Sequence, residues 1–138
     1  GDGIVGLLDP LPQGASLGGS ARAACSGEPT LLPSNWPKAG TFGFQLLAGN
    51  APANRPGLLM LGSAASQPVS FAGVAIWIDL YRPAIVLPVL SNGLGEAAIA
   101  IPLPGTKGPS ASFQVFWLET ALCPRRLSAS CYLRLVLQ

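Results

Sequence analysis

The sequence predicts an all-β protein, specifically an antiparallel β-sandwich of about seven to eight short strands, Ig-like or jelly-roll-like. With 17 Gly and 14 Pro among 138 residues, turn and helix-breaking residues are too frequent for a helical bundle. Apolar residues make up 49% of the chain and charged residues 10%, which favours a buried core over disorder. From Thr30 onward, short apolar runs alternate with turn residues at even intervals, as in sandwiches.

Seven apolar runs of strand length follow one another along the chain. They span residues 40–48, 57–63, 74–80, 84–90, 97–103, 112–121 and 130–138. Residues 41–46 alternate in polarity, and Arg134 alternates with Leu133 and Leu135, so both runs predict strands with one face toward water. Residues 74–78 are apolar at every position and predict a central strand covered on both faces.

Turn and breaker residues predict the connections between these strands. Asn92 and Gly93 lie between two apolar runs and predict a β-hairpin, because both residue types accept positive φ. Proline removes a main-chain donor, so prolines inside apolar runs are expected at strand starts, bulges or edges. The prolines concerned are Pro52, Pro56, Pro83 and Pro88.

The chain divides into an N-terminal extension, residues 1–24, and a β-sandwich domain, residues 25–138. Residues 3–8 form an apolar segment of strand length, and residues 9–24 are rich in Pro, Gly, Ser and Ala, as in flexible linkers. The segment is either the first strand of its own domain or a strand donated to a neighbouring subunit. In the second case its assembly residues are Ile4, Val5, Leu7 and Leu8.

Charge excludes nucleic acid as a partner. Eight Lys and Arg against six Asp and Glu give a net charge of +2, and among the basic residues only Arg125 and Arg126 are adjacent. Nucleic-acid surfaces need clustered cations. A membrane span is not expected either, because Pro68 and several glycines divide the long uncharged stretch 56–78 into short strands.

Nothing in the sequence predicts an enzyme, a cofactor or a metal site. The chain has no His, which removes the commonest general base and metal ligand. No nucleophile-elbow pentapeptide occurs, and the six acids show no metal-ligand spacing. A carboxylate dyad assembled by the fold is the alternative that stays open.

Cys25, Cys123 and Cys131 are the disulfide candidates. A local bond between Cys123 and Cys131 would close a hairpin loop and leave Cys25 over. Alternatively Cys25 bonds to one of the other two, or an odd cysteine links two chains. Three buried, unbonded thiols are the remaining possibility. Any disulfide would indicate an oxidising compartment.

Residues 25–138 resemble a known β-sandwich module. Cys25-Ser26-Gly27 looks like its entry motif, and residues 49–62 look like its G-A-P-x-N-x-P-x-L-L-L-x-G element. The closing strand is similar too, with Cys131 in place of the usual Asn. The module occurs at the C-terminal end of many large secreted bacterial proteins, in a family of uncertain function. The resemblance implies a sandwich fold, an extracellular or cell-surface location and no catalytic residues.

These observations predict a non-enzymatic, secreted structural subunit that forms a homo-oligomer or homopolymer. A mean hydropathy of +0.46 with few charges implies apolar surface that one small sandwich cannot bury. Addition of the N-terminal strand to the edge of the next subunit is a head-to-tail contact, which would build a filament, for example at the bacterial surface.

The alternative function is a carbohydrate or cell-surface binding module. Sugar sites use aromatic faces beside a few polar groups, and Trp36, between Asn35 and Pro37, is the best candidate for a ligand contact. Tyr81 and Tyr132 would also serve if exposed. Trp77 and Trp117 lie within strand patterns and are expected in the core.

Overall fold

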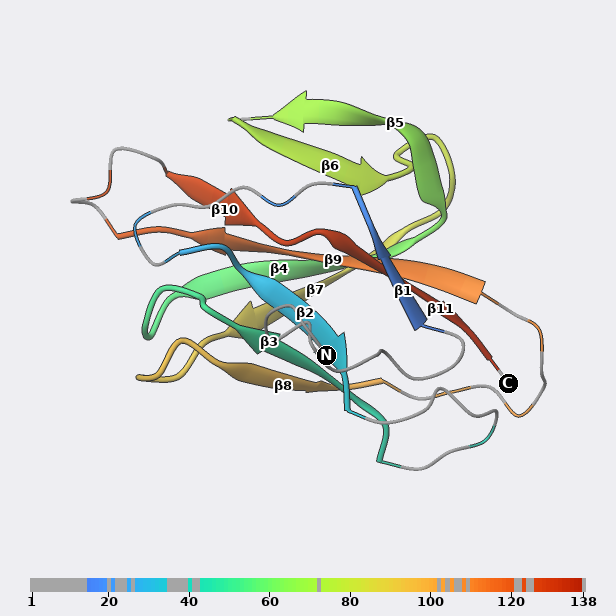
Figure 1. Ribbon diagram of the computed structural model, residues 1–138, viewed down its shortest axis with the longest axis horizontal. Coiled ribbons are helices and arrows are strands. Elements are labelled where there is room, and N and C mark those ends of the chain that lie inside the picture. Colours follow the sequence, from blue (N-terminus) through green and yellow to red (C-terminus); the bar gives the residue numbers. More distant parts are fainter. Residues whose placement is uncertain are drawn as a thin grey trace.

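The computed structural model describes residues 15–19, 21, 25, 27–34, 40, 43–71, 73–101, 103, 105, 108, 110–120, 123 and 126–137. Within these ranges every regular element is a β-strand, which confirms the predicted all-β antiparallel sandwich (Figure 1). There are eleven strands instead of seven to eight. They are β1 (Ala15–Gly18), β2 (Thr30–Pro33), β3 (Gln45–Gly49), β4 (Pro56–Gly62), β5 (Ala64–Phe71), β6 (Val74–Ile78), β7 (Ile85–Leu90), β8 (Ala97–Ala100), β9 (Ser110–Leu118), β10 (Leu127–Ala129) and β11 (Tyr132–Val136).

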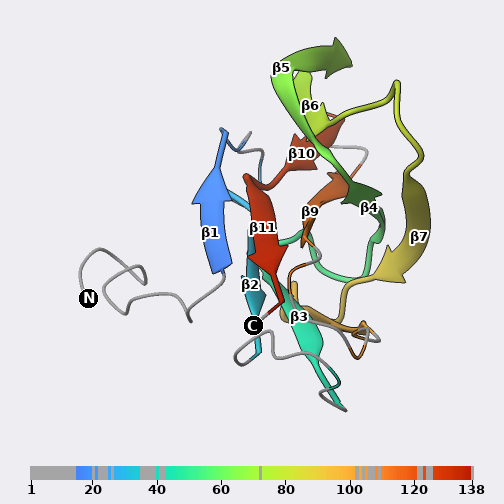
Figure 2. The ribbon, with the colours of Figure 1, turned by 90° about the vertical axis from the view of Figure 1, so that its right-hand side faces the viewer.

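The strands form two packed sheets and a separate two-stranded sheet. The larger sheet has the order β1-β11-β9-β4-β7, with β10 also pairing to β9, and the smaller sheet has the order β2-β3-β8. Figure 2 shows these two layers together with the β5-β6 pair, which projects beyond the large sheet. The main core lies between the layers. Leu31 and Leu46 of the small sheet meet Leu59, Val115 and Trp117 of the large one, and all five are buried.

Alternation along the outer strands follows the sequence pattern. In β11, Leu133 and Leu135 are buried and Arg134 is exposed, as predicted. In β3, Leu46 and Ala48 are buried while Leu47 is exposed. Each strand therefore turns one face to the core and one to water.

The prediction that residues 74–78 form a central strand is wrong. Among the described strands, β6 pairs only with β5, and only its ends, Val74 and Ile78, are buried. The strand covered on both faces is β9, where residues 112–117 are all buried. The outer face of β9 carries the polar but buried Gln114. Because burial was predicted from runs of apolar residues, the burial of this face could not be recognised from the sequence.

Asn92 and Gly93 do not form a hairpin. β7 pairs with β4 in the large sheet and β8 pairs with β3 in the small one, so the turn carries the chain from one layer to the other. The Asn92 side-chain oxygen accepts hydrogen bonds from the backbone N–H groups of Leu94 and Glu96, at 2.9 and 3.0 Å. The left-handed residue is Gly95, with φ of 73°. The Asn therefore acts through an Asx-type turn and not through positive φ.

Four strands were not expected from the sequence: β1, β2, β5 and β10. β1 lies within residues 9–24, expected as a flexible linker, yet it pairs with β11 at the edge of the large sheet. Its glycine-rich sequence shows little strand propensity, so pairing with an apolar neighbour, not local preference, forms the strand. Pro56 is the first residue of β4 and Pro88 lies on the edge strand β7, as expected, whereas Pro52 and Pro83 lie outside the strands, in the segments that precede β4 and β7.

Candidate assembly interface

Large apolar side chains are exposed at several places among the described residues. They include Leu17, Leu47, Leu58, Val69, Phe71, Leu80, Ile85, Val86, Leu90, Leu94 and Leu118. Single exposed apolar residues are ordinary, whereas adjacent ones mark interaction surfaces. Exposed apolar side chains that lie next to one another are therefore the candidates for an interface.

The clearest apolar surface lies on the outer face of the edge strand β7. Leu87 and Val89 pack against the core, so the alternating residues Val86, Pro88 and Leu90 face away from it. Pro88 lies directly opposite Leu58 of β4 in the strand register. We call Leu58, Val86, Pro88 and Leu90 the β7 patch. Leu90 is 69% exposed, and Val86 and Leu58 are about half exposed at 49% and 48%.

Among the described strands, β7 and β8 each have one unpaired edge, and these two edges differ in chemistry. The backbone N–H of Ser91 donates to the carbonyl of Arg55 at 3.0 Å, so alternation directs the main-chain groups of Val86, Pro88 and Leu90 outward. Pro88 has no N–H group to donate to an added strand, so the edge of β7 is a poor site for pairing with another strand.

The strand β8 (Ala97–Ala100) contains no proline. The N–H of Ile101 donates to the carbonyl of Phe44 at 3.0 Å, so alternation directs the main-chain groups of Ala98 and Ala100 away from β3. In the described part of the chain, β3 is the only strand that pairs with β8. The edge of β8 therefore offers intact donors and acceptors.

An apolar cleft of about 400 Å³ opens at the end of the sandwich where β7 begins and β8 ends. Its lining comes from β4, β7, β9 and β11 of the large sheet and from the end of β8 with the residues that follow it. The lining residues are Leu61, Ile85, Leu87, Ala100, Ile101, Leu103, Ser110, Ala111, Phe113, Leu135 and Leu137. Among the described residues of this lining, Ser110 is the one with a polar side chain. The cleft therefore suits an apolar occupant and offers water few partners.

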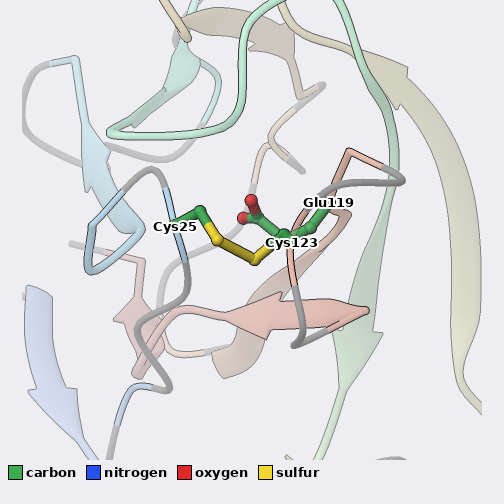
Figure 3. Close-up of side chains that lie close together, drawn as sticks. All are labelled: Cys25, Glu119 and Cys123. Carbon is green, nitrogen blue, oxygen red and sulfur yellow. A yellow bond between two sulfur atoms is a disulfide. The ribbon is translucent and has the colours of Figure 1, made fainter.

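Cys25 and Cys123 form a disulfide, 98 residues apart in sequence (Figure 3). The suggested local bond between Cys123 and Cys131 is therefore wrong, as is the possibility of three unbonded thiols. Hairpin geometry alone favoured the local bond, but β10 and β11 pair with different parts of β9 and not with each other. A disulfide indicates an oxidising environment.

The carboxylate of Glu119 lies beside this disulfide, with its oxygen and the two sulfur atoms within 4.8 Å of one another (Figure 3). Three such atoms resemble a metal-ligand set, but sulfur atoms bonded to each other are not the thiolates that metals bind. Glu119 is 2% exposed and accepts a hydrogen bond from the Ser128 hydroxyl at 3.0 Å. The guanidinium of Arg55 donates to the backbone carbonyl of Glu119 at 3.1 Å. Glu119 is thus held as a structural group.

Cys131 is a half-buried free thiol. Burial raises the pKa of this thiol above its ordinary value, and the negative charge of Glu28 raises it further. Protonated thiols are poor nucleophiles and poor metal ligands. Cys131 therefore has neither the ionisation nor the exposure of a reactive cysteine.

A smaller cavity of about 260 Å³ lies between the β5-β6 pair and the turn after β6. Unlike the apolar cleft, it combines polar groups of Ser66, Gln67 and Asp79 with the ring of Tyr81. Tyr81 is 94% exposed, and its backbone N–H donates to the Asp79 carboxylate at 2.9 Å. The cavity has the mixed aromatic and polar character of a sugar site.

The residues expected in functional roles are distributed as follows. Ile4, Val5, Leu7, Leu8 and Trp36 lie outside the described residues. Trp117 is fully buried, as expected, whereas Trp77 is half-buried and packs its ring 6.1 Å from that of Tyr132. The Tyr132 ring is therefore engaged with Trp77, whereas the Tyr81 side chain is almost fully exposed.

The cleft could not be predicted from the sequence, because its lining residues come from five separate strands and the segments that follow two of them. Comparison of the chain with protein-family models, curated proteins and solved structures gives no match. The resemblance of residues 25–138 to the secreted bacterial module stays a prediction. Within the described ranges, no helix has the length and apolar character needed to cross a membrane.

Proposed function

We propose that this protein is a non-enzymatic, extracellular structural subunit that associates with copies of itself. The observation that carries the proposal is the β7 patch, in which Leu58, Val86, Pro88 and Leu90 lie side by side and exposed at the edge of the large sheet. Exposed apolar neighbours of this kind are typical of protein interfaces. The Cys25–Cys123 disulfide supports an oxidising, extracellular setting.

The chemistry of the described residues favours association over catalysis. The buried carboxylate of Glu119 is engaged by Ser128 beside a disulfide, and the Cys131 thiol has a raised pKa. The chain has no His, which is the commonest activating base for a cysteine or serine nucleophile. The exposed apolar surface, including the β7 patch, is therefore the feature that a function has to explain.

Charged substitutions in the β7 patch test the proposal. We expect the intact protein to form oligomers or filaments, visible by negative-stain microscopy and by sedimentation. Val86→Lys/Leu90→Lys places two like charges on the patch and should dissociate the assembly by desolvation and repulsion. Leu94→Lys is the matched control, because Leu94 is 81% exposed in a turn outside the patch. An intact protein that is monomeric at micromolar concentration would overturn the proposal.

A second candidate function is carbohydrate binding, and the cavity beside Tyr81 favours it. The exposed ring with Ser66, Gln67 and Asp79 nearby provides a stacking face and hydrogen-bonding groups. Trp36 was the candidate contact from the sequence and lies outside the described residues. A glycan array probed with the intact protein and with Tyr81→Ala tests this candidate. Binding lost in the variant supports it, and binding that persists in the variant, or none by the intact protein, contradicts it.

A further inference from the structure

The apolar cleft runs across the end of the large sheet, and each strand from β11 to β7 contributes to its wall. Leu135 belongs to β11, Phe113 to β9, Leu61 to β4 and Ile85 to β7. Protein interiors have few voids larger than a water molecule, and a cavity of about 150 Å³ already holds a benzene-sized group. The volume of about 400 Å³ therefore has room for more than one aliphatic side chain. An apolar group in the cleft would also shield Ile85, which is 55% exposed, from water.

The chain enters β1 at this same end of the sandwich. β1 begins at Ala15, and Ala15 pairs with Leu135, which is itself a wall of the cleft. Because β1 and β11 are antiparallel, the start of β1 lies beside the end of β11 (Figure 2). Ala15 also packs against the main core. The residues that precede Ala15 therefore start from a point beside the cleft.

The N-terminal residues are long enough to reach every wall of the cleft. Paired Cα atoms lie about 5 Å apart, so Ala15 stands next to the nearest wall, Leu135. The most distant wall, β7, is four strand spacings from β1, which amounts to about 19 Å. The extended chain from Ala15 back to Leu8 spans about 23–25 Å. Residues 3–8 can therefore lie along the cleft of their own chain.

We propose that residues 3–8 fill the cleft of their own chain, with apolar side chains of this segment inserted between the two sheets. The segment carries no charge, and apart from two glycines it consists of Ile4, Val5, Leu7 and Leu8. In an extended segment alternate side chains point to opposite sides, so Ile4 and Leu8 share one side and Val5 and Leu7 share the other. Either side offers two aliphatic groups to the apolar lining of the cleft.

The short connection to β1 favours the chain's own segment over the segment of a second copy. A group joined to its binding site through a few residues has an effective concentration of about 1 mM. Residues 9–14 make such a connection between the segment and β1. Other copies at about 1 μM would compete at a roughly thousandfold lower concentration. Exchange of the segment between copies is therefore the disfavoured arrangement.

The cleft and the β7 patch are different surfaces. Leu87 packs toward the core and lines the cleft, whereas Val86 and Leu90 of the patch face away from the core. A segment in the cleft therefore leaves the patch exposed. Filling the cleft needs one chain only, so it does not depend on the proposed self-association.

Paired cysteines in one full-length chain test the inference. In a Cys131→Ser background, the chain carries Ala100→Cys, at an exposed residue that lines the cleft, with either Leu7→Cys or Leu8→Cys. These two donor positions lie on opposite sides of the segment. We expect oxidation of the dilute protein with copper–phenanthroline to join the two cysteines within the chain for one of the donor positions, as shown by a monomeric mass and by peptide mapping. In the matched control, Ala53→Cys replaces Ala100→Cys at an exposed alanine just before β4, and no link should form.

Chains that carry one added cysteine each show whether the segment comes from another copy. A chain with Ala100→Cys and a chain with Leu7→Cys or Leu8→Cys are mixed in urea, refolded together by dilution and oxidised in the same way. We expect no mixed dimers. Mixed dimers in place of the link within one chain would show that copies exchange the segment, and would overturn the inference. The absence of a link within the chain at both donor positions would overturn it as well.

Removing the apolar side chains of residues 3–8 tests whether the segment fills the cleft. A fourfold variant keeps the length of the chain and should bind the apolar dye anilinonaphthalenesulfonate more strongly than the intact protein. Adding Ala100→Trp, which places an indole at the cleft, should remove this gain. Leu94→Ser, at an exposed side chain in a turn, is the control and should not raise dye binding. Equal dye binding by the intact protein and the fourfold variant would overturn the inference. The fourfold variant carries Ile4→Ser, Val5→Ser, Leu7→Ser and Leu8→Ser.

Discussion

The side chain of Gln114 accepts a hydrogen bond from the backbone N–H of Trp77 at 2.8 Å, and this contact ties the β5-β6 pair to the large sheet. The Gln114 amide nitrogen donates in turn to the carbonyls of Ala75 and Ser130, both at 2.9 Å. Gln114 is fully buried at the centre of β9. One polar residue therefore joins three segments through main-chain groups that would otherwise be buried without partners.

Gln114→Leu should lower the free energy of unfolding by about 2–4 kcal/mol, because it leaves buried main-chain donors and acceptors unpaired. Chemical denaturation measures the change. Gln67→Leu is the matched control, since Gln67 is exposed on β5, and its effect should stay within about 0.5 kcal/mol. Equal effects of the two substitutions would contradict the structural role of Gln114.

Much of the fold was predictable, because alternation reports directly on which face of a strand is buried. Leu133, Arg134 and Leu135 illustrate this in β11. Alternation fails where burial comes from a third layer. β9 is covered on its outer face by the β5-β6 pair, where Val74 packs near Phe116 and Ala75 accepts a hydrogen bond from Gln114, although the polar Gln114 predicts a face toward solvent. The uniformly apolar sequence of β6 predicts a central strand, although β6 belongs to a two-stranded sheet.

The candidate site was less predictable than the fold. The β7 patch needs the register that places Leu58 opposite Pro88, and strand pairing is not encoded locally. The cleft joins residues as far apart as Leu61 and Leu137. The apolar segment of residues 3–8, in contrast, could be proposed from the sequence alone, because its six residues are contiguous and uncharged.

Gly95→Ala should destabilise the turn between β7 and β8 by about 1–3 kcal/mol. Gly95 has φ of 73°, and an added Cβ would collide with the carbonyl oxygen of Ala51. Gly93→Ala provides the control, because its Cβ would meet only the side-chain nitrogen of Asn54, at 3.9 Å. Thermal unfolding of both variants compares the two positions, and a Gly95→Ala protein as stable as the intact chain would refute this account of the turn.

Replacing both bonded cysteines, as Cys25→Ser/Cys123→Ser, should cost about 2–4 kcal/mol of stability. The bond closes a loop between residues 98 apart in sequence, so its loss increases the conformational entropy of the unfolded chain. Non-reducing peptide mapping should show the peptide of Cys25 joined to that of Cys123. Cys131→Ser should preserve this linkage, and a map that joins Cys131 to either residue would contradict the pairing.

The Cys131 thiol should make stability fall at alkaline pH. Its pKa is raised in the folded protein, first by burial and then by Glu28, so below the ordinary thiol pKa of about 8.5 both states hold the proton. Above that pH the unfolded chain loses the proton first, which favours unfolding until the folded pKa is passed. Urea unfolding of the intact protein and of Cys131→Ala should diverge as the pH rises above the ordinary thiol pKa of about 8.5. Parallel curves would show that Cys131 is not responsible.

The central claim is that apolar surface outside the sandwich core is covered by other copies of the chain. Light scattering on the intact, disulfide-bonded protein at micromolar concentration measures this most directly. The account predicts a mass that is a multiple of the 14.1 kDa chain and grows with concentration. A mass of 14.1 kDa at every concentration would contradict it.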